Sequence, residues 1–292
     1  MATLREVRGR IVGVKKTQKI TRAMKMVAAA KLRRAQNAVV AARPYANKIK
    51  QLLQHLSFQV QEQTGPLLTS REVGAVALVV VTADRGMCGA FNSNLVKAVI
   101  QHCSQKYPKW NERGKVKLFC IGKKGADFLG KQHFTITRKY LGVYNQLGFG
   151  QAQMITRDIV GGYLGGEYDR VEVFYNEFKN IANSRIVMEQ FLPVPVPGDK
   201  SLTTMVNYIY EPSKELILEA MIPKHLNFQI WRVLLESNAA EQGARMTAME
   251  SATKNANDMI RQLQLQYNKA RQASITKELL EVVAGAEALS QA

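Results

Sequence analysis

Few residues of this 292-residue chain have types and spacing that could do chemistry, and the most suggestive lie between positions 84 and 89. The segment Asp84-Arg85-Gly86-Met87-Cys88-Gly89 follows a valine-rich run that predicts a buried strand, and it precedes a predicted helix. Glycines at such a turn can bind an anion through backbone amides at the helix N-terminus. The spacing matches neither the dinucleotide nor the P-loop glycine pattern, so a tight structural turn and an anion site both stay open. The same two alternatives apply to residues 122–125.

The remaining candidates do not form a recognisable catalytic or metal-binding set. Asp84 lies where α/β enzymes place catalytic acids, but a lone aspartate there also serves as a turn or cap residue. The histidines are scattered, and the cysteines lack CxxC spacing, which fits buried thiols in a reducing compartment. These residues are His55, His102, His133, His225, Cys88, Cys103 and Cys120. We therefore predict no catalytic residue, no metal site and no cofactor.

The elements that must position any site are two long helices at the ends of the chain. Apolar residues recur at alternating spacings of four and three from Leu4 to Val60, and again from Met249 to Ala284. A 3.5-residue period over this length predicts helices wound around a partner helix. On the first helix the seam positions are Leu4, Val7, Ile11, Val14, Ala28, Leu32, Ala35, Val39, Ala42, Ala46, Ile49, Leu53, Leu56 and Val60, with polar Gln18, Thr21 and Lys25. On the last helix they are Met249, Ala252, Ala256, Met259, Leu263, Ala270, Ala273, Leu280 and Ala284, with polar Gln266 and Lys277.

Between these helices, strand and helix signals alternate with short turns. Strands are predicted at 75–81, 115–121, 134–137, 171–178 and 184–192, the last two as a hairpin. Helices are predicted for about 16 residues after the 84–89 turn, through Phe91, Leu95, Val99 and Ile100, and also around 126–129 and at 152–164. This order is typical of a mostly parallel sheet with a hairpin at its edge.

The expected fold class is therefore α/β: a long antiparallel coiled coil formed by the N- and C-terminal helices plus a central Rossmann-like α/β domain. We expect residues 1–65 to form the N-terminal coiled-coil helix and residues 73–211 the central domain. Residues 212–292 should form the C-terminal coiled-coil helix, which pairs with 1–65. Pro223 is expected to interrupt this last helix early.

The pairing of the two helices can also be predicted. If Val60 lies opposite Glu236, the numbers of facing residues add up to about 296. Met24 would then face the neighbourhood of Gln272, and both chain termini would meet at one tip.

The basic charge of the chain is concentrated in its first helix. The net charge is +18, and residues 1–60 contain 14 basic residues but a single acid, Glu6. Such a helix could contact acidic protein surfaces, face solvent, or bind nucleic acid or lipid. Zinc-ligand spacing and aromatic RNP-like strands are absent from the sequence, and the longest apolar stretch, 73–83, is too short to span a membrane. The basic start imitates a transit peptide, but its heptad register continues into the seam, so we expect it to belong to the mature protein.

Polar residues at three consecutive seam positions have two explanations. Gln18, Thr21 and Lys25 could set the register of the coiled coil, or they could contact a third body. Near the C-terminus a second apolar face appears, and two helices alone would leave it exposed to water, which suggests a socket in a partner. Its residues are Ile275, Leu279, Val282, Val283, Ala286 and Leu289.

Four segments in the same order resemble the signatures of a known family. Residues 17–36, 82–92, 236–249 and 267–286 are similar to motifs of the γ subunit of F-type ATP synthases, and together they span essentially the whole chain. The short segment 193–210 lacks cysteine, so the redox-regulatory insertion of chloroplast members is absent. The sequence of residues 32–36, Leu-Arg-Arg-Ala-Gln, and the lack of a presequence indicate the bacterial type.

The resemblance implies a rotor without a catalytic site of its own. Its partners would be the α and β subunits, which form an α3β3 ring, together with the ε subunit and the c-ring; nucleic acid is not among them. The rotor would couple proton-driven c-ring rotation to the β sites that make ATP from ADP and phosphate. It would be peripheral, without a transmembrane segment, on the cytoplasmic side of the bacterial inner membrane. Carried over by position, the residues implied to contact the α and β subunits are Arg22, Met24, Lys25, Arg271, Gln272, Ile275, Thr276, Glu278, Leu279, Val282, Val283 and Leu289.

Overall fold

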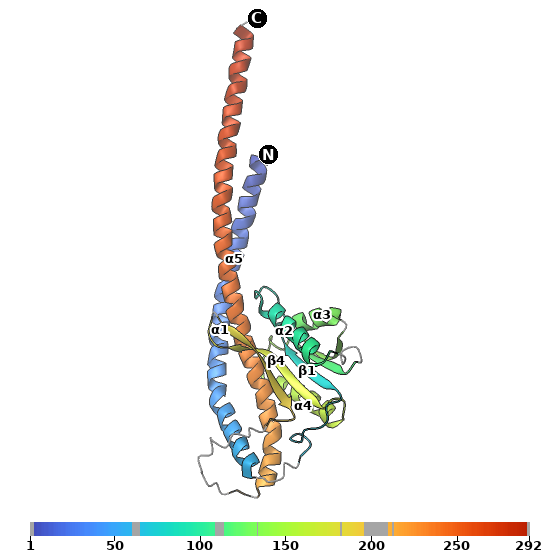
Figure 1. The fold of residues 1–292 in the computed structure, drawn as a ribbon. Helices are drawn as coiled ribbons and strands as arrows, with labels where there is room; N and C mark the ends of the chain where they lie inside the picture. The colour runs from blue at the N-terminus through green and yellow to red at the C-terminus, as the bar shows by residue number, and fades with distance from the viewer. Residues whose placement is uncertain are drawn as a thin grey trace. The chain divides into compact units, whose positions relative to one another are not determined.

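Two very long helices begin and end the chain in the computed structural model (Figure 1). Helix α1 spans Leu4–Gln59 and helix α5 spans Lys214–Ser290, and the two run antiparallel as the heptad pattern predicted. The structure describes residues 3–59, 65–108, 114–132, 134–181, 183–195, 210–211 and 213–290. Val60, which was expected to end the first seam, lies outside these residues.

Side-chain oxygens accept hydrogen bonds from backbone amides at the start of both helices. The Thr3 amide donates to Glu6 Oε2 at 3.2 Å and the Glu6 amide donates to Thr3 Oγ1 at 3.3 Å, a reciprocal capping box. At the start of α5, the Leu216 amide donates to Ser213 Oγ at 3.3 Å. The prediction that Pro223 interrupts this helix is wrong, because α5 continues through it. Buried leucine and isoleucine side chains at 218, 222 and 226 hold the helix on both sides of the missing donor.

The chain folds into two compact units. The helical-pair unit consists of Met1–Val27 and Met246–Ala292, and the sheet unit consists of Ala28–Arg245. In both units the predicted seam positions of α1 with described side chains are buried or half-buried.

On α5 one half of the predicted seam is displaced by a residue. Met259 is 51% exposed, whereas Ile260 is 8% exposed and faces the seam. Between Met249 and Ala270 the less exposed positions are Met249, Ala252, Thr253, Ala256, Ile260, Leu263, Tyr267 and Ala270. A seam through Met259 and a seam through Ile260 both keep the alternation of four and three with Met249 and Leu263, so the spacing alone could not distinguish them. The observed choice buries the bulkier Ile260 and Tyr267 in place of Met259 and Gln266.

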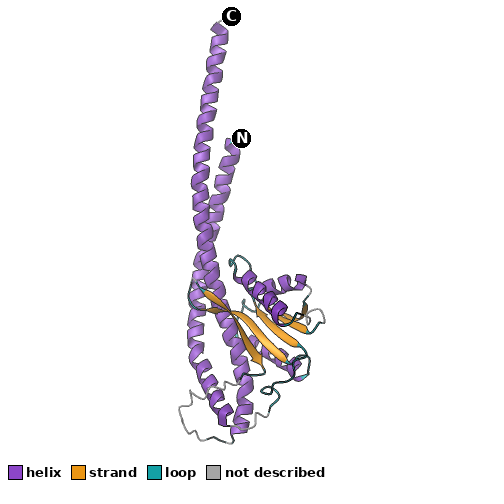
Figure 2. Ribbon diagram, in the orientation of Figure 1, coloured by secondary structure: helices purple, strands orange, loops and turns teal. Residues whose placement is uncertain are grey.

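A five-stranded sheet forms the centre of the sheet unit (Figure 2). Its strands are β1 (Val76–Val81), β2 (Val116–Ile121), β3 (Thr135–Tyr140), β4 (Arg170–Phe178) and β5 (Ser184–Leu192), in the order β3-β2-β1-β4-β5. All neighbours are parallel except β4 and β5, which form the predicted antiparallel hairpin. The helices are α2 (Phe91–Lys106), α3 (Lys123–Leu129) followed by the 3₁₀ turn η1 (Gly130–Gln132), and α4 (Phe149–Leu164).

Alternate residues of β1 enter two different cores, because successive side chains of a strand point to opposite faces. Val76, Leu78 and Val80 pack with α2 and α3 on one face. Ala77, Val79 and Val81 pack on the other face with α4 and with the buried stripes of α1 and α5 within this unit. All six residues of β1 are buried, as its valine-rich sequence predicted.

Two adjacent glycines of α4 test how tightly this second core is packed. A Cβ at Gly162 would lie 2.8 Å from Tyr168 Cζ, whereas a Cβ at Gly161 meets nothing within 4 Å. Tyr168 is fully buried and its hydroxyl donates to the Ile159 carbonyl at 2.6 Å, so it has no room to move. We expect Gly162→Ala to lower the free energy of unfolding by about 2 kcal/mol and Gly161→Ala to raise it by about 0.5 kcal/mol. Chemical denaturation measures both; equal effects of the two variants would contradict this packing.

Candidate partner-binding site

The three polar seam residues of α1 are paired across the helical-pair unit. The hydroxyls of Thr21 and Thr253 are 2.8 Å apart, and Lys25 Nζ lies 2.6 Å from Glu250 Oε1. Gln18 Nε2 donates to Asn257 Oδ1. Because each polar group meets a polar group on the facing helix, these pairs favour the first explanation, in which they set the register.

The observed register differs from the predicted one. The numbers of the paired residues add up to 274 or 275, whereas the prediction was about 296. The heptad pattern fixes the register only up to a multiple of seven, and the prediction placed Val60 opposite Glu236. In the structure α5 begins at Lys214, so the paired part of α5 starts earlier in the chain.

As a result, the two groups of predicted contact residues are not brought together. Met24 lies near residue 250 and not near Gln272, and the termini do not meet at one tip. The start of α1 pairs with α5 near residue 271 by the same register, and α5 continues alone beyond it, as Figure 1 shows. This unpaired part, residues 272–290, is called the single-helix end below; it is about 28 Å long.

The single-helix end exposes large apolar side chains. The exposed fractions are 48% for Ile275, 61% for Leu279, 64% for Leu280, 71% for Val282 and 57% for Val283. Its polar contacts are local: Thr276 Oγ1 donates to the Gln272 carbonyl at 3.0 Å, and Ser274 Oγ donates to Glu278 Oε1 at 3.2 Å. The side chain of Leu289 lies outside the described residues. A helix in water does not bury these apolar groups by itself, so this surface is suited to binding a partner.

The predicted contact residues on α1 lie elsewhere in the helical-pair unit. Arg22 is exposed, and Met24 and Lys25 are half-buried. Lys25 makes its ion pair with Glu250, whose side chain is 59% exposed. The site therefore has two parts: a basic part on α1 and an apolar part on α5.

A charge swap tests whether the Lys25–Glu250 pair contributes to the register. Lys25→Glu places two carboxylates together and is expected to lower the free energy of unfolding by up to about 1 kcal/mol, since the pair is partly exposed. The Lys25→Glu, Glu250→Lys double variant should recover most of this loss. Thermal unfolding followed by circular dichroism measures both, and a double variant as unstable as the single one would contradict the pairing.

The turn at residues 84–89 is held by Asp84. Asp84 Oδ1 accepts hydrogen bonds from the amides of Lys123 at 3.1 Å and of Gly142 at 3.0 Å. It therefore links the segments that follow β1, β2 and β3. Met87 and Gly89 adopt positive φ angles of 61° and 59°, the geometry of a tight turn. These contacts give Asp84 a structural role, which was one of the two alternatives for this residue.

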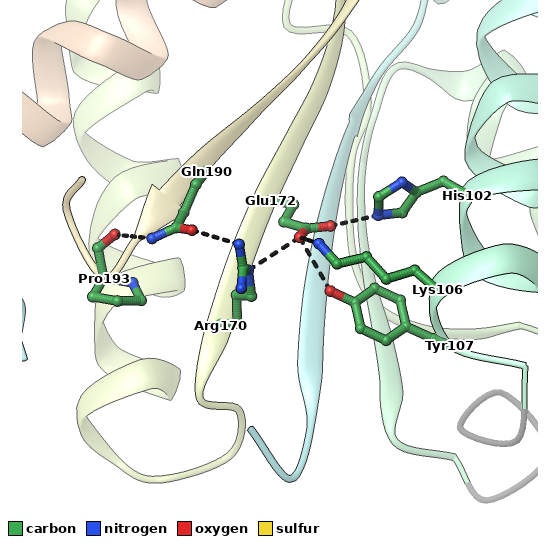
Figure 3. Close-up of polar contacts among 7 residues, drawn as sticks. All are labelled: His102, Lys106, Tyr107, Arg170, Glu172, Gln190 and Pro193. Atoms are coloured by element: carbon green, nitrogen blue, oxygen red, sulfur yellow. Dashed lines mark hydrogen bonds and ion pairs between the residues drawn. The ribbon is translucent and has the colours of Figure 1, made fainter. Parts of the chain in front are cut away.

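A buried carboxylate that sequence reasoning missed lies on β4. Glu172 is fully buried and accepts hydrogen bonds from His102 Nε2 at 2.7 Å, Lys106 Nζ at 2.6 Å and the Tyr107 hydroxyl at 3.1 Å (Figure 3). Arg170 Nε lies 3.1 Å from Glu172 Oε1. The only sequence signal was a glutamate between two valines in a buried strand.

The electrostatics of this cluster indicate a structural ion pair. Burial alone would raise the pKa of Glu172, but the hydrogen bonds and charges of Lys106 and His102 outweigh it and hold that pKa below its usual value. Since both carboxylate oxygens have partners, Glu172 is not free to act on a substrate. Figure 3 shows the network continuing from Arg170 to Gln190, whose Nε2 donates to the Pro193 carbonyl at 2.7 Å.

Other candidate groups are buried or scattered. Cys88, Cys103 and Cys120 are free and buried, as expected, and burial raises the pKa of the Cys103 and Cys120 thiols to about 12. Among the described residues there is no group of three or more His, Cys, Asp or Glu side chains that could hold a metal ion. Within the same part of the chain, no helix combines the length and apolar character required to cross a bilayer.

These features define a class of protein: an antiparallel helical pair built from the two ends of the chain, a small Rossmann-like sheet, and an exposed apolar helical end. The model of the family described as ATP synthase matches residues 3–289. The "ATP synthase gamma chain" of Chloroherpeton thalassium is 51% identical to this chain and that of Chlorobaculum tepidum 49% identical; the alignments cover 100% of this chain and 99% and 100% of the relatives. This chain therefore belongs to the ATP synthase gamma chain family.

Solved structures share the fold. A chain of the Euglena gracilis mitochondrial ATP synthase in an OSCP/F1/c-ring structure aligns with a TM-score of 0.71 at 22% identity, covering 98% of this chain and 94% of that one. A chain of the Tetrahymena thermophila central stalk and c-ring structure aligns with a TM-score of 0.61 at 24% identity, covering 80% and 99%.

Proposed function

We propose that this chain is the central-stalk rotor of a bacterial F-type ATP synthase and has no catalytic activity of its own. Membership of the gamma chain family over the full length supports the rotor role. The observation that carries the proposal is the single-helix end of α5, on which five large apolar side chains are 48–71% exposed. A ring of α and β subunits would provide the socket that covers them.

The asymmetry of the helical-pair unit would allow a rotor to give three chemically identical β subunits different environments. A ring of three α and three β subunits has threefold pseudosymmetry, whereas a pair of helices that becomes one helix has none. Each β subunit therefore meets a different side of the rotor at any moment, and a turn of the rotor exchanges these environments. Proton-driven rotation would in this way take each β site through binding of ADP and phosphate, formation of ATP and its release.

The two parts of the site would divide this work. The apolar end would hold the axis of the rotor, because burying apolar area contributes roughly 25 cal/mol per Å². Basic groups of α1 would add several contacts that are each under about 1 kcal/mol and salt-sensitive. The proposed contacts with the α and β subunits are Arg22, Met24, Lys25, Arg271, Gln272, Ile275, Thr276, Glu278, Leu279, Val282, Val283 and Leu289.

The sheet unit would contact other partners than the helical-pair unit does. We propose that the c-ring and the ε subunit contact the central domain, residues 73–211, and the adjoining parts of the coiled coil from 1–65 and 212–292. The structural neighbours belong to a central stalk with its c-ring and to a rotor of mitochondrial ATP synthases, which supports this assignment. The rotor would then be peripheral to the bacterial inner membrane, on its cytoplasmic side.

Co-expression with the α and β subunits of a gamma-chain relative's enzyme tests the proposal. A tagged copy of this chain should capture both subunits, and the captured complex should hydrolyse ATP, whereas the chain alone should not. Failure to capture them, or ATP turnover by the chain after they are removed, would overturn the proposal. A nucleic-acid binder would instead retain DNA or RNA in a strongly salt-dependent manner.

A further inference from the structure

Open α/β sheets have a preferred place for ligands. It lies outside the carboxyl ends of the strands, where the chain connections leave in opposite directions. In this sheet the place is between β1 and β4: the helices after β1 and β2 cover one face, while α4, which leads into β4, covers the other. The turn at 84–89 follows β1 at this position, as a phosphate-binding turn would.

In this chain α5 occupies that place. Gly243 lies against the end of β4, since a Cβ there would be 3.6 Å from Phe178 Cε2 and 3.5 Å from the Ile181 carbonyl oxygen. Four polar residues of the same stretch are almost fully buried, although a helix facing water would expose them: Glu236, Ser237, Glu241 and Gln242. A polar, buried stretch of helix thus fills the position at which related sheets hold a ligand.

Arg245 connects this stretch to the turn after β1. Its Nη1 pairs with Glu241 Oε1 at 2.5 Å, and its Nη2 donates to the carbonyls of Arg85 at 3.4 Å and Gly86 at 3.3 Å. The side chains of both pair members are largely buried, at 12% and 5% exposed. Asp84 in the same turn fixes the ends of the neighbouring strand connections. The guanidinium therefore contacts the backbone that would otherwise surround a bound anion.

We propose that residues 236–245 of α5 act as a built-in ligand of the sheet, and that the Glu241–Arg245 pair is the positioning element that locks the sheet to the C-terminal helix. Given the proposed rotor function, torque applied to the sheet enters α5 through this joint. Because α5 lies at the position where a related sheet would bind a nucleotide, the isolated chain should not bind one there.

The test uses Arg245→Gln, which removes the charge and one of the two nitrogens that make these contacts, and Arg245→Lys, which keeps the charge. Arg261→Gln is the matched control, because the Arg261 side chain on the same helix is 81% exposed. In the full isolated chain, Arg245→Gln should speed hydrogen exchange of the amides in 85–89 at least tenfold, Arg245→Lys less, and Arg261→Gln not at all. In the complex reconstituted into vesicles, Arg245→Gln should lower the ratio of ATP-driven proton pumping to ATP hydrolysis at least twofold.

The two readouts separate this inference from the proposed function. Unchanged exchange in Arg245→Gln would overturn the joint, as would faster exchange with an unchanged pumping ratio in assembled complexes. If the wild-type chain does not assemble with the α and β subunits, the proposed function fails, while the exchange measurement still decides whether Arg245 locks the turn. A last readout is calorimetric titration of the wild-type chain with ADP. Binding of ADP would contradict the inference that α5 fills the nucleotide position of the sheet.

Discussion

The Val282→Ser, Val283→Ser double variant should bind the ring of α and β subunits about 100-fold more weakly than the wild-type chain. Both valines are more than half exposed on the single-helix end. Burying a valine contributes about 1.5 kcal/mol, so losing two removes about 3 kcal/mol of binding free energy. Serine and valine have similar helix propensities, so α5 itself should be unaffected. Titration of the ring with labelled chain measures the affinity.

Glu281→Ser is the control for this prediction. Glu281 lies on the same turn with 65% of its side chain exposed and pairs only weakly with Lys277 at 3.5 Å. Its replacement should change the affinity less than threefold. If the double variant binds as tightly as Glu281→Ser, the apolar end does not hold the rotor in the ring.

Replacing Glu172 by glutamine should lower the free energy of unfolding by about 2 to 3 kcal/mol. The neutral amide leaves Lys106 and Arg170 without their carboxylate in a largely buried cluster. This loss of stability is small for a buried ion pair because both cations reach solvent: the Lys106 side chain is 37% exposed and the Arg170 side chain 32% exposed. Urea denaturation measures it, with Glu167→Gln as control, since the partly exposed Glu167–Lys117 pair should contribute under about 1 kcal/mol.

The same variant predicts a pH dependence. The pKa of Glu172 in the folded chain is lowered from 4.5, so its stabilisation is fully present above that pH and is lost as the pH falls through the folded-state pKa. The difference in stability between wild type and Glu172→Gln should therefore shrink below about pH 4.5. A difference that stays constant on acidification would show that the carboxylate charge is not what stabilises the cluster.

Periodicity predicted the existence and type of the helices and strands of this chain, but not all of their limits. The repeat from Leu4 predicted a helix that ends within one residue of the observed Gln59, and the limits of β5 were predicted as observed. These features depend on local patterns that repeat many times or on a strand bounded by turn residues. β3 was predicted too short because its end, Arg138-Lys139-Tyr140, is charged on an edge strand and lacks an apolar signal.

What the sequence left open depends on contacts between distant residues. A heptad repeat fits any register that differs by seven residues, and the polar pairs that select one, such as Thr21 with Thr253, are visible only once both helices are in place. Likewise, Glu172 and Arg245 resemble ordinary charged residues until their partners on other elements are known. The proposed contact residues came from family resemblance, and the structure adds that their two groups lie apart along the helices.

The pairing of the chain ends also governs the order of folding during synthesis. Thr21 and Thr253 are separated by 232 positions, so the part of α1 in the helical-pair unit has no partner helix until the ribosome has made nearly the whole chain. At roughly 5–20 residues per second this wait lasts on the order of 10–50 s. Throughout it a basic helix with an uncovered apolar stripe is exposed to the cell, while the sheet, whose β1–β4 pairing needs only residues up to 178, can already form. We therefore expect the helical pair to be the last part of this chain to fold.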